Sequence, residues 1–164
     1  MPFWRSAARP GAAAEPGLPH SLNYSDALLR ALLSSVRVIA MPGASFKPER
    51  PSNGVMRFLQ SRGYRVIPVN PGQAGKTLLG ERIYPRLADI PDKVDMVDIF
   101  RNQAALGRTT DEAIAIGAKA VWMQLGLIDE DAAARAEAAG LTVIMNRCPA
   151  IEIPRLFGEA DPHG

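Results

Sequence analysis

The chain has 164 residues, of which 47% are hydrophobic, and its formal net charge is +2. This length is enough for one well-buried core and too short for two ordinary domains. The nearly balanced charge gives no support for bulk nucleic-acid binding, and no apolar run approaches the roughly 20 residues that span a bilayer. The single cysteine, Cys148, excludes an internal disulfide and suits a reducing compartment. We therefore predict a soluble, cytoplasmic, single-domain protein that binds neither nucleic acid nor membrane.

The two ends of the chain lack the apolar periodicity of packed elements. Residues 1–23 contain four prolines, and they lack the apolar stretch of about 7–15 residues that a signal peptide requires. We predict a flexible N-terminal arm over residues 1–23, a folded domain over residues 24–157 and a flexible C-terminal tail over residues 158–164. Both histidines, His20 and His163, fall in these ends.

The central part of the chain alternates between apolar runs and segments with helical spacing. A first helix is predicted to begin at Ser25 or Asp26, where a side chain can cap it. Further helices are predicted over residues 53–62, within 103–116 and from Asp129 to about residue 139, and buried strands over residues 36–41, 65–69, 95–100, 118–125 and 141–145. A short strand is predicted at residues 83–84 and a helical turn at 87–91. Asp95 and Asp98 are expected at the start of their strand or on a partly open face.

Alternating strands and helices predict an α/β fold with a parallel sheet covered by helices on both faces. In such sheets, ligands bind beyond the carboxyl ends of the strands, near the point where the strand order reverses. The first three predicted strands end at residues 42–43, 70–71 and 100–101. We expect these three ends to line one crevice.

The loop after the first predicted strand, within residues 38–52, is a candidate phosphate cradle. Its Gly43, Ser45, Lys47, Arg50 and Ser52 precede a helix, whose N-terminal amides and dipole favour an anion. Lys76 and Arg101, in the loops after the second and third strands, are available for a further phosphate. The alternative is that Ser52 only caps the helix and the basic side chains are solvated.

Two common nucleotide-binding motifs are absent from this loop. The G-x-G-x-x-G pattern of NAD-binding proteins is missing, and the second strand ends in neutral residues in place of the acid that binds ribose hydroxyls. An ATP-type P-loop is also missing, because the glycines of residues 72–77 are too close together and follow the wrong strand.

Several motifs in order resemble the bacterial CoA-binding protein family, which is similar to the N-terminal CoA-binding domain of the succinyl-CoA synthetase α subunit. The motifs are G-A-S-x-K-P-x-R-P-S at residues 43–52, Y-R-V-I-P-V-N-P at 64–71, L-x-D-I-P at 87–91, V-D-I-F-R at 97–101, G-A-K-A-V-W-M-Q at 117–124, A-E-A-A-G-L at 136–141 and N-R-C-P at 146–149. The resemblance covers about residues 25–157. It implies a Rossmann-like three-layer sandwich, with a mostly parallel sheet of about five strands, that binds coenzyme A or an acyl-CoA.

The resemblance also assigns the predicted site residues. It implies that the pyrophosphate lies on Gly43, Ala44, Ser45, Arg50 and Ser52, with Lys47 in the same loop. The adenine and ribose-phosphate end is assigned to Val69, Asn70, Pro71 and Lys76, and the cleft is completed by Phe100 and Arg101. Pro42 departs from the family pattern, because it removes a backbone N–H donor before the glycine. The neutral end of the second strand fits a ligand whose 3′-phosphate a carboxylate would repel.

No catalytic constellation is evident in the sequence. Cys148 has no histidine near it in sequence, although Arg147 beside it is a candidate to lower the thiol pKa; the alternative is a packed small side chain. We predict no metal site and a non-catalytic CoA-binding module, with a homodimer or a partner enzyme as possible assemblies. Two alternatives stay open: a dinucleotide-dependent oxidoreductase, and an interaction protein with a vestigial nucleotide crevice.

Overall fold

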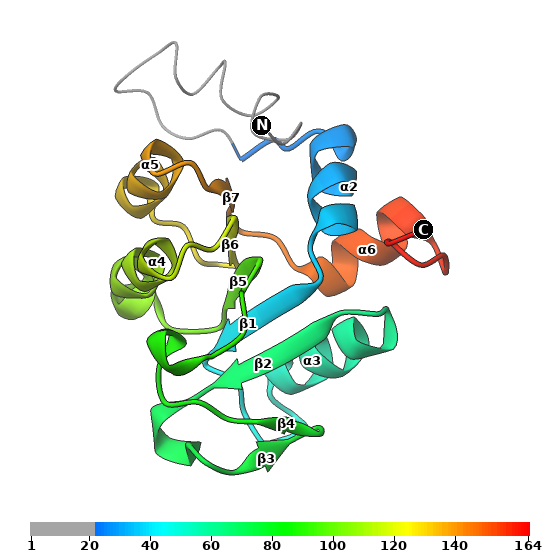
Figure 1. Cartoon of the computed structure of the whole chain (residues 1–164). Coiled ribbons are helices and arrows are strands. Elements are labelled where there is room, and N and C mark those ends of the chain that lie inside the picture. The colour runs from blue at the N-terminus through cyan, green and yellow to red at the C-terminus, as the bar shows by residue number, and fades with distance from the viewer. Residues whose placement is uncertain (1–21) are drawn as a thin grey trace.

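The computed structural model describes residues 22–164, so nearly all of the predicted N-terminal arm lies outside the described residues (Figure 1). The helices are α2 Asp26–Ser35, α3 Pro51–Ser61, α4 Leu106–Ala115, α5 Glu130–Ala138 and α6 Pro149–Phe157. The main strands are β1 Val38–Pro42, β2 Arg65–Val69, β5 Met96–Ile99, β6 Ala120–Met123 and β7 Thr142–Ile144. Short elements lie between them: β3 Thr77–Leu78, β4 Glu81–Arg82 and the 3-10 turns η1 Pro71–Gln73, η2 Leu87–Asp89 and η3 Gln103–Ala105.

The five main strands form one parallel sheet in the order β2-β1-β5-β6-β7. One apolar cluster joins the sheet to α2, α3 and α6, and a second joins it to α4 and α5 on the opposite face. Figure 1 shows these two helical layers on either side of the sheet. The predicted three-layer, Rossmann-like α/β fold with five parallel strands is therefore confirmed. The only antiparallel pair in residues 22–164 is the short ribbon of β3 and β4.

The helix boundaries follow from local side-chain chemistry. Ser25 caps α2 by accepting a hydrogen bond from the amide of Leu28, and Asp129 caps α5 in the same way through the amide of Ala132. Gly63 lies just after α3 with a φ of 91°, a left-handed conformation that ends the helix at little cost for glycine. These signals are strong in the sequence because each acts within a few residues.

Three expectations are corrected. Helix α3 begins at Pro51, two residues earlier than predicted, since proline is well suited to the first helical position. Helix α6 was not predicted, although it closes one face of the sheet. Asp98 is fully buried in the middle of β5 and does not lie on an open face.

The last residues of the chain, for which the sequence predicts a flexible tail, fold back onto the domain. The guanidinium of Arg62 donates to the carbonyls of Gly158 and Ala160 at 2.8 and 2.6 Å. The imidazole of His163 lies 2.7 Å from the carbonyl of Val36, and its ring contacts the ring of Tyr64 edge-on at 4.6 Å. His163 therefore contributes to packing and does not lie in a loose end.

Candidate functional site

The sheet has its switch point between β1 and β5. The chain leaves β1 toward α3, which packs with β2 and α6, whereas it leaves β5 toward α4, which packs on the other face with α5. Because the two connections diverge, a crevice opens between the carboxyl ends of β1 and β5, the usual ligand position in open α/β sheets.

Gly43 begins the loop that follows β1, at a point where the chain passes very close to the end of β5. Its φ is 87°, and its amide donates to the carbonyl of Val69 at 3.0 Å. A Cβ at this position would overlap the carbonyl oxygen of Phe100 and lie 2.7 Å from its carbonyl carbon. Only glycine satisfies both the backbone conformation and this approach.

Side chains of the predicted site hold the shape of the loop between β1 and α3. The hydroxyl of Ser52 accepts from the amide of Ser45 at 3.1 Å, and the Asn53 side chain donates to the Ser45 carbonyl at 3.0 Å. The Asn70 side chain donates to the carbonyl of Ala44 at 2.9 Å and accepts from the following loop. Ser52 is not the N-cap of α3; that position is Arg50, whose side chain makes no capping bond. The N-terminus of α3 therefore carries no side-chain cap.

Pro42 ends β1 without interrupting the sheet. It is paired with Val69 of β2, and its carbonyl accepts from the amide of Phe100 at 2.9 Å. The donor that proline lacks falls at the last pair of the strand, so the neighbouring ladders on both sides stay intact.

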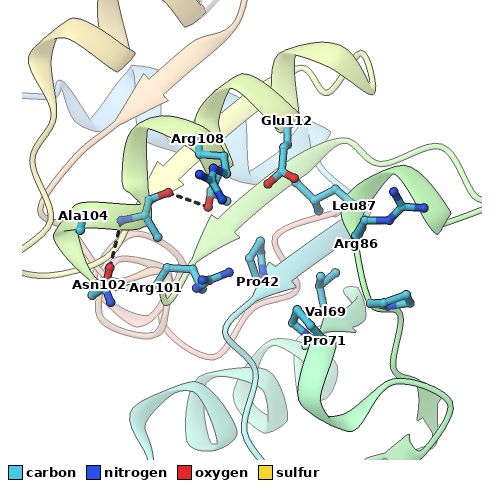
Figure 2. Close-up of a pocket in the computed structure, with 13 residues that line it drawn as sticks. Pro42, Val69, Pro71, Arg86, Leu87, Arg101, Asn102, Ala104, Arg108 and Glu112 are labelled. Carbon is cyan, nitrogen blue, oxygen red and sulfur yellow. Dashed lines mark hydrogen bonds between the residues drawn. The ribbon is translucent and has the colours of Figure 1, made fainter.

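A pocket of about 410 Å³ opens on the α4 side of the switch point (Figure 2). It is lined by Pro42, Val69, Pro71, Pro85, Arg86, Leu87, Arg101, Asn102, Ala104, Ala105, Arg108, Thr109 and Glu112. Pro42, Pro71 and Arg101 represent the three strand ends that were expected to share one crevice. The volume falls in the range of about 300–1,000 Å³ that is common for small-molecule sites.

The pocket is rich in arginine. Arg86 donates two hydrogen bonds to Asp89, at 3.0 and 2.9 Å, and this bonding holds the pKa of the Asp89 carboxyl below its usual range. The guanidinium groups of Arg101 and Arg108, in contrast, have no hydrogen-bond or ion-pair partner in residues 22–164. Uncommitted guanidinium groups on a pocket wall are suited to a phosphate or carboxylate of a ligand.

The remaining predicted residues lie around this pocket without lining it. Gly43 and Phe100 lie where the end of β1 meets the end of β5, and Ala44 follows Gly43, whereas Lys47 and Arg50 are exposed in the loop before α3. Lys76 is exposed, and its amine donates to the Gln73 side chain at 2.9 Å. Of the predicted site residues, only Val69, Pro71 and Arg101 line the pocket itself.

The sequence reading missed the wall contributed by η2 and α4. Arg86 precedes η2, and Arg108 and Glu112 lie one turn apart on α4. The signal available in the sequence was the spacing of Arg108 and Glu112 on a helix that follows a strand end, because residues in the first turns of such helices face the crevice.

The candidate reactive thiol is buried away from the pocket wall. Cys148 packs in the cluster around Trp122 and Ile153, which is the packed-side-chain alternative. The neighbouring Arg147 donates to the carbonyl of Leu22 at 3.0 Å and forms a 3.7 Å ion pair with Glu152.

Within residues 22–164, no group of three or more His, Cys, Asp or Glu side chains is placed to hold a metal ion. In the same part of the chain, no helix is long and apolar enough to cross a bilayer.

Comparison with known proteins places the chain among CoA-binding domains. The model of a family described as a CoA binding domain matches residues 37–154. The protein YneT of Bacillus subtilis is 34% identical over 126 residues, which are 77% of this chain and 92% of YneT. A hypothetical protein from Pyrococcus horikoshii superimposes with a TM-score of 0.79 at 39% identity, covering 88% of this chain and 99% of that one.

A larger enzyme contains a similar domain. The dinucleotide-forming acetyl-coenzyme A synthetase 1 of Candidatus Korarchaeum cryptofilum, in complex with phosphate and ADP, matches with a TM-score of 0.61 and 28% identity. The match covers 70% of this chain and 26% of the synthetase, so the two proteins share one domain and not the whole enzyme.

Proposed function

The chain belongs to the CoA-binding domain family, and from this premise we propose that it binds coenzyme A or an acyl-CoA and has no catalytic site of its own. The observation that carries the proposal is the pocket at the switch point, where Arg101 and Arg108 have no partner in the described chain. CoA carries three phosphate groups, and arginine forms strong charge-assisted hydrogen bonds with phosphate.

The proposed arrangement places the pyrophosphate over the loop between β1 and α3. Gly43 allows the ligand to approach the backbone, and the uncapped N-terminus of α3 with Arg50 supplies positive potential. Ser45 and Ser52 act mainly by holding the loop, since the hydroxyl of Ser52 is engaged by the Ser45 amide. Ala44 belongs to the same loop, and Lys47 lies at its exposed edge.

The adenosine end is proposed to lie in the pocket between β2 and α4. Val69 and Pro71 supply apolar wall, while Asn70 fixes the turn that follows β2. Lys76, exposed in the loop after β2, is proposed to meet the 3′-phosphate, and Phe100 and Arg101 follow β5. The structure contains no acid at the end of β2, in agreement with a ligand that carries a phosphate on its ribose.

Titration calorimetry with CoA, dephospho-CoA and NAD tests the proposal. Binding of CoA that weakens when the 3′-phosphate is removed supports a CoA-binding protein. A preference for NAD would instead support an oxidoreductase, and no heat with any of the three ligands would leave an interaction protein with a vestigial crevice. Mass spectrometry of the ligand that co-purifies distinguishes free CoA from an acyl-CoA.

Replacing Arg101 by methionine is expected to weaken CoA binding by about 1–3 kcal/mol, because a charge-assisted hydrogen bond to phosphate is lost while most of the side-chain volume is kept. Lys93→Met is a matched control, since it removes one exposed positive charge from the opposite end of the same strand. Calorimetry of both variants gives the comparison. Equal affinities for Arg101→Met and Lys93→Met would remove Arg101 from the site.

A further inference from the structure

Glu112 is the one acidic side chain among the residues that line the pocket. It is half-buried on α4, and in residues 22–164 it makes no hydrogen bond and no ion pair. Figure 2 shows its carboxylate directed toward Pro42, while the Arg101 side chain points toward Pro42 from the other side of the pocket. Arg86 interacts electrostatically with Glu112, but its guanidinium already donates two hydrogen bonds to Asp89. An acceptor without a partner in a pocket of basic residues requires a separate explanation.

The position of Glu112 along α4 separates it from Arg101 and Gly43, whereas Arg108 lies one turn away on the same helix. Arg101 precedes the helix, and Glu112 lies six residues after Leu106, the first residue of α4. At 1.5 Å per residue, this places Glu112 about 9 Å along the helix from its N-terminus. A nucleotide whose phosphates lie near Arg101 and Gly43, with its adenosine end in the pocket as proposed, extends its base toward Glu112.

The walls between these two ends suit a flat, apolar ring. Three prolines, Pro42, Pro71 and Pro85, line the pocket together with Leu87. At the exposed rim, the guanidinium of Arg86 is hydrogen-bonded to Asp89, and a guanidinium plane stacks well on aromatic rings.

We propose that Glu112 recognises the adenine base by accepting a hydrogen bond from its 6-amino group. An ionised carboxylate only accepts hydrogen bonds, so its partner in the ligand must be a donor. Phosphate oxygens repel it, and the ribose hydroxyl is adjacent to the 3′-phosphate, where the same repulsion operates. Within the adenosine half of CoA, which is the part proposed to occupy this pocket, the amino group of adenine is the donor farthest from the phosphates. This inference rests on the proposed function and extends it to the base selectivity of the site.

The experiment compares CoA with 1,N6-ethenocoenzyme A, in which a fused ring replaces both hydrogens of the amino group. The wild-type protein is expected to bind CoA about tenfold to a hundredfold more tightly than the etheno analogue, the range for a hydrogen bond to a charged group. In Glu112→Met, which keeps the length of the side chain but has no comparable acceptor, this ratio is expected to fall close to one. Glu112→Gln retains a carbonyl acceptor and is expected to keep part of the ratio.

A control variant and a steric alternative make the outcome specific. The exposed Glu130 lies on the neighbouring helix α5 and does not line the pocket, so Glu130→Met is expected to keep the wild-type ratio. If steric exclusion of the fused ring caused the discrimination, Glu112→Met would also keep it, and the proposal would be wrong. A wild-type protein that binds CoA with equal affinity to the analogue also overturns the role of Glu112. Failure of the proposed function can be distinguished from failure of the Glu112 proposal, because the wild-type protein would then not bind CoA at all.

Discussion

Replacing Gly43 by alanine is expected to lower the free energy of unfolding by about 2–5 kcal/mol and to abolish CoA binding. The left-handed backbone conformation contributes about 1–2 kcal/mol of this loss. The remainder comes from overlap of the new methyl group with the carbonyl of Phe100, because a backbone atom at a strand end has little freedom to move. Relief of the overlap separates β1 from β5 at the switch point, and the proposed pyrophosphate loop loses its shape.

Gly117→Ala is the matched control for this prediction. Gly117 also has a left-handed conformation, with a φ of 75°, but a Cβ there would meet no atom within 4 Å. This variant is therefore expected to lose only the conformational part, about 1–2 kcal/mol, and to bind CoA normally. Urea denaturation followed by circular dichroism gives the two free energies, and calorimetry gives the affinities. Equal destabilisation of the two variants would show that the approach of Gly43 to Phe100 is not important.

The sequence predicted the fold well because the signals for it are local. The strand at residues 65–69 is found at the predicted bounds, and the caps at Ser25 and Asp129 act on amides three residues away. A run of buried β-branched residues between turn signals identifies a central parallel strand without any knowledge of its neighbours. Five such runs are sufficient to define the sheet.

The sequence predicted only the side of the site that is formed by one continuous sequence motif. The loop that contains Gly43 is one segment, so its glycine and hydroxyl residues could be identified together. The opposite wall comes from η2 and α4, and it exists because Arg86 and Glu112, distant in sequence, line the same pocket. The spacing of residues along the sequence does not predict that two distant segments line the same pocket. The same limitation explains Ser52, whose hydroxyl serves the amide of Ser45 across the loop and not its own helix.

Asp98 shows a different limitation, because a charged residue in an apolar run does not reveal its own burial. In the structure, Asp98 is fully buried, and both of its carboxyl oxygens lack a hydrogen-bond partner in the described chain. It is paired with Trp122 in the register of β5 and β6. Burial without a partner disfavours the carboxylate, so the pKa of Asp98 is raised well above its ordinary value of 3.8.

The stability of the protein is therefore expected to fall as the pH rises above about 4. The unfolded chain releases the Asp98 proton near the ordinary pKa, whereas the folded protein retains it, so folding becomes coupled to proton uptake. The free energy of unfolding then declines by up to about 1.4 kcal/mol per pH unit, until the pH exceeds the raised pKa of the folded state. Below the ordinary pKa both states are protonated, and this loss disappears.

Asp98→Asn is expected to remove this part of the pH dependence, because the amide does not ionise while the shape of the side chain is nearly kept. The variant gains stability relative to the wild type as the pH rises from 4 to 8, and the gain is largest at the upper end. Urea denaturation at intervals across this range measures the difference, with Glu49→Gln as a control that removes an exposed carboxylate. Parallel curves for Asp98→Asn and the wild type would show that the buried carboxyl acquires a partner or solvent that stabilises its charge.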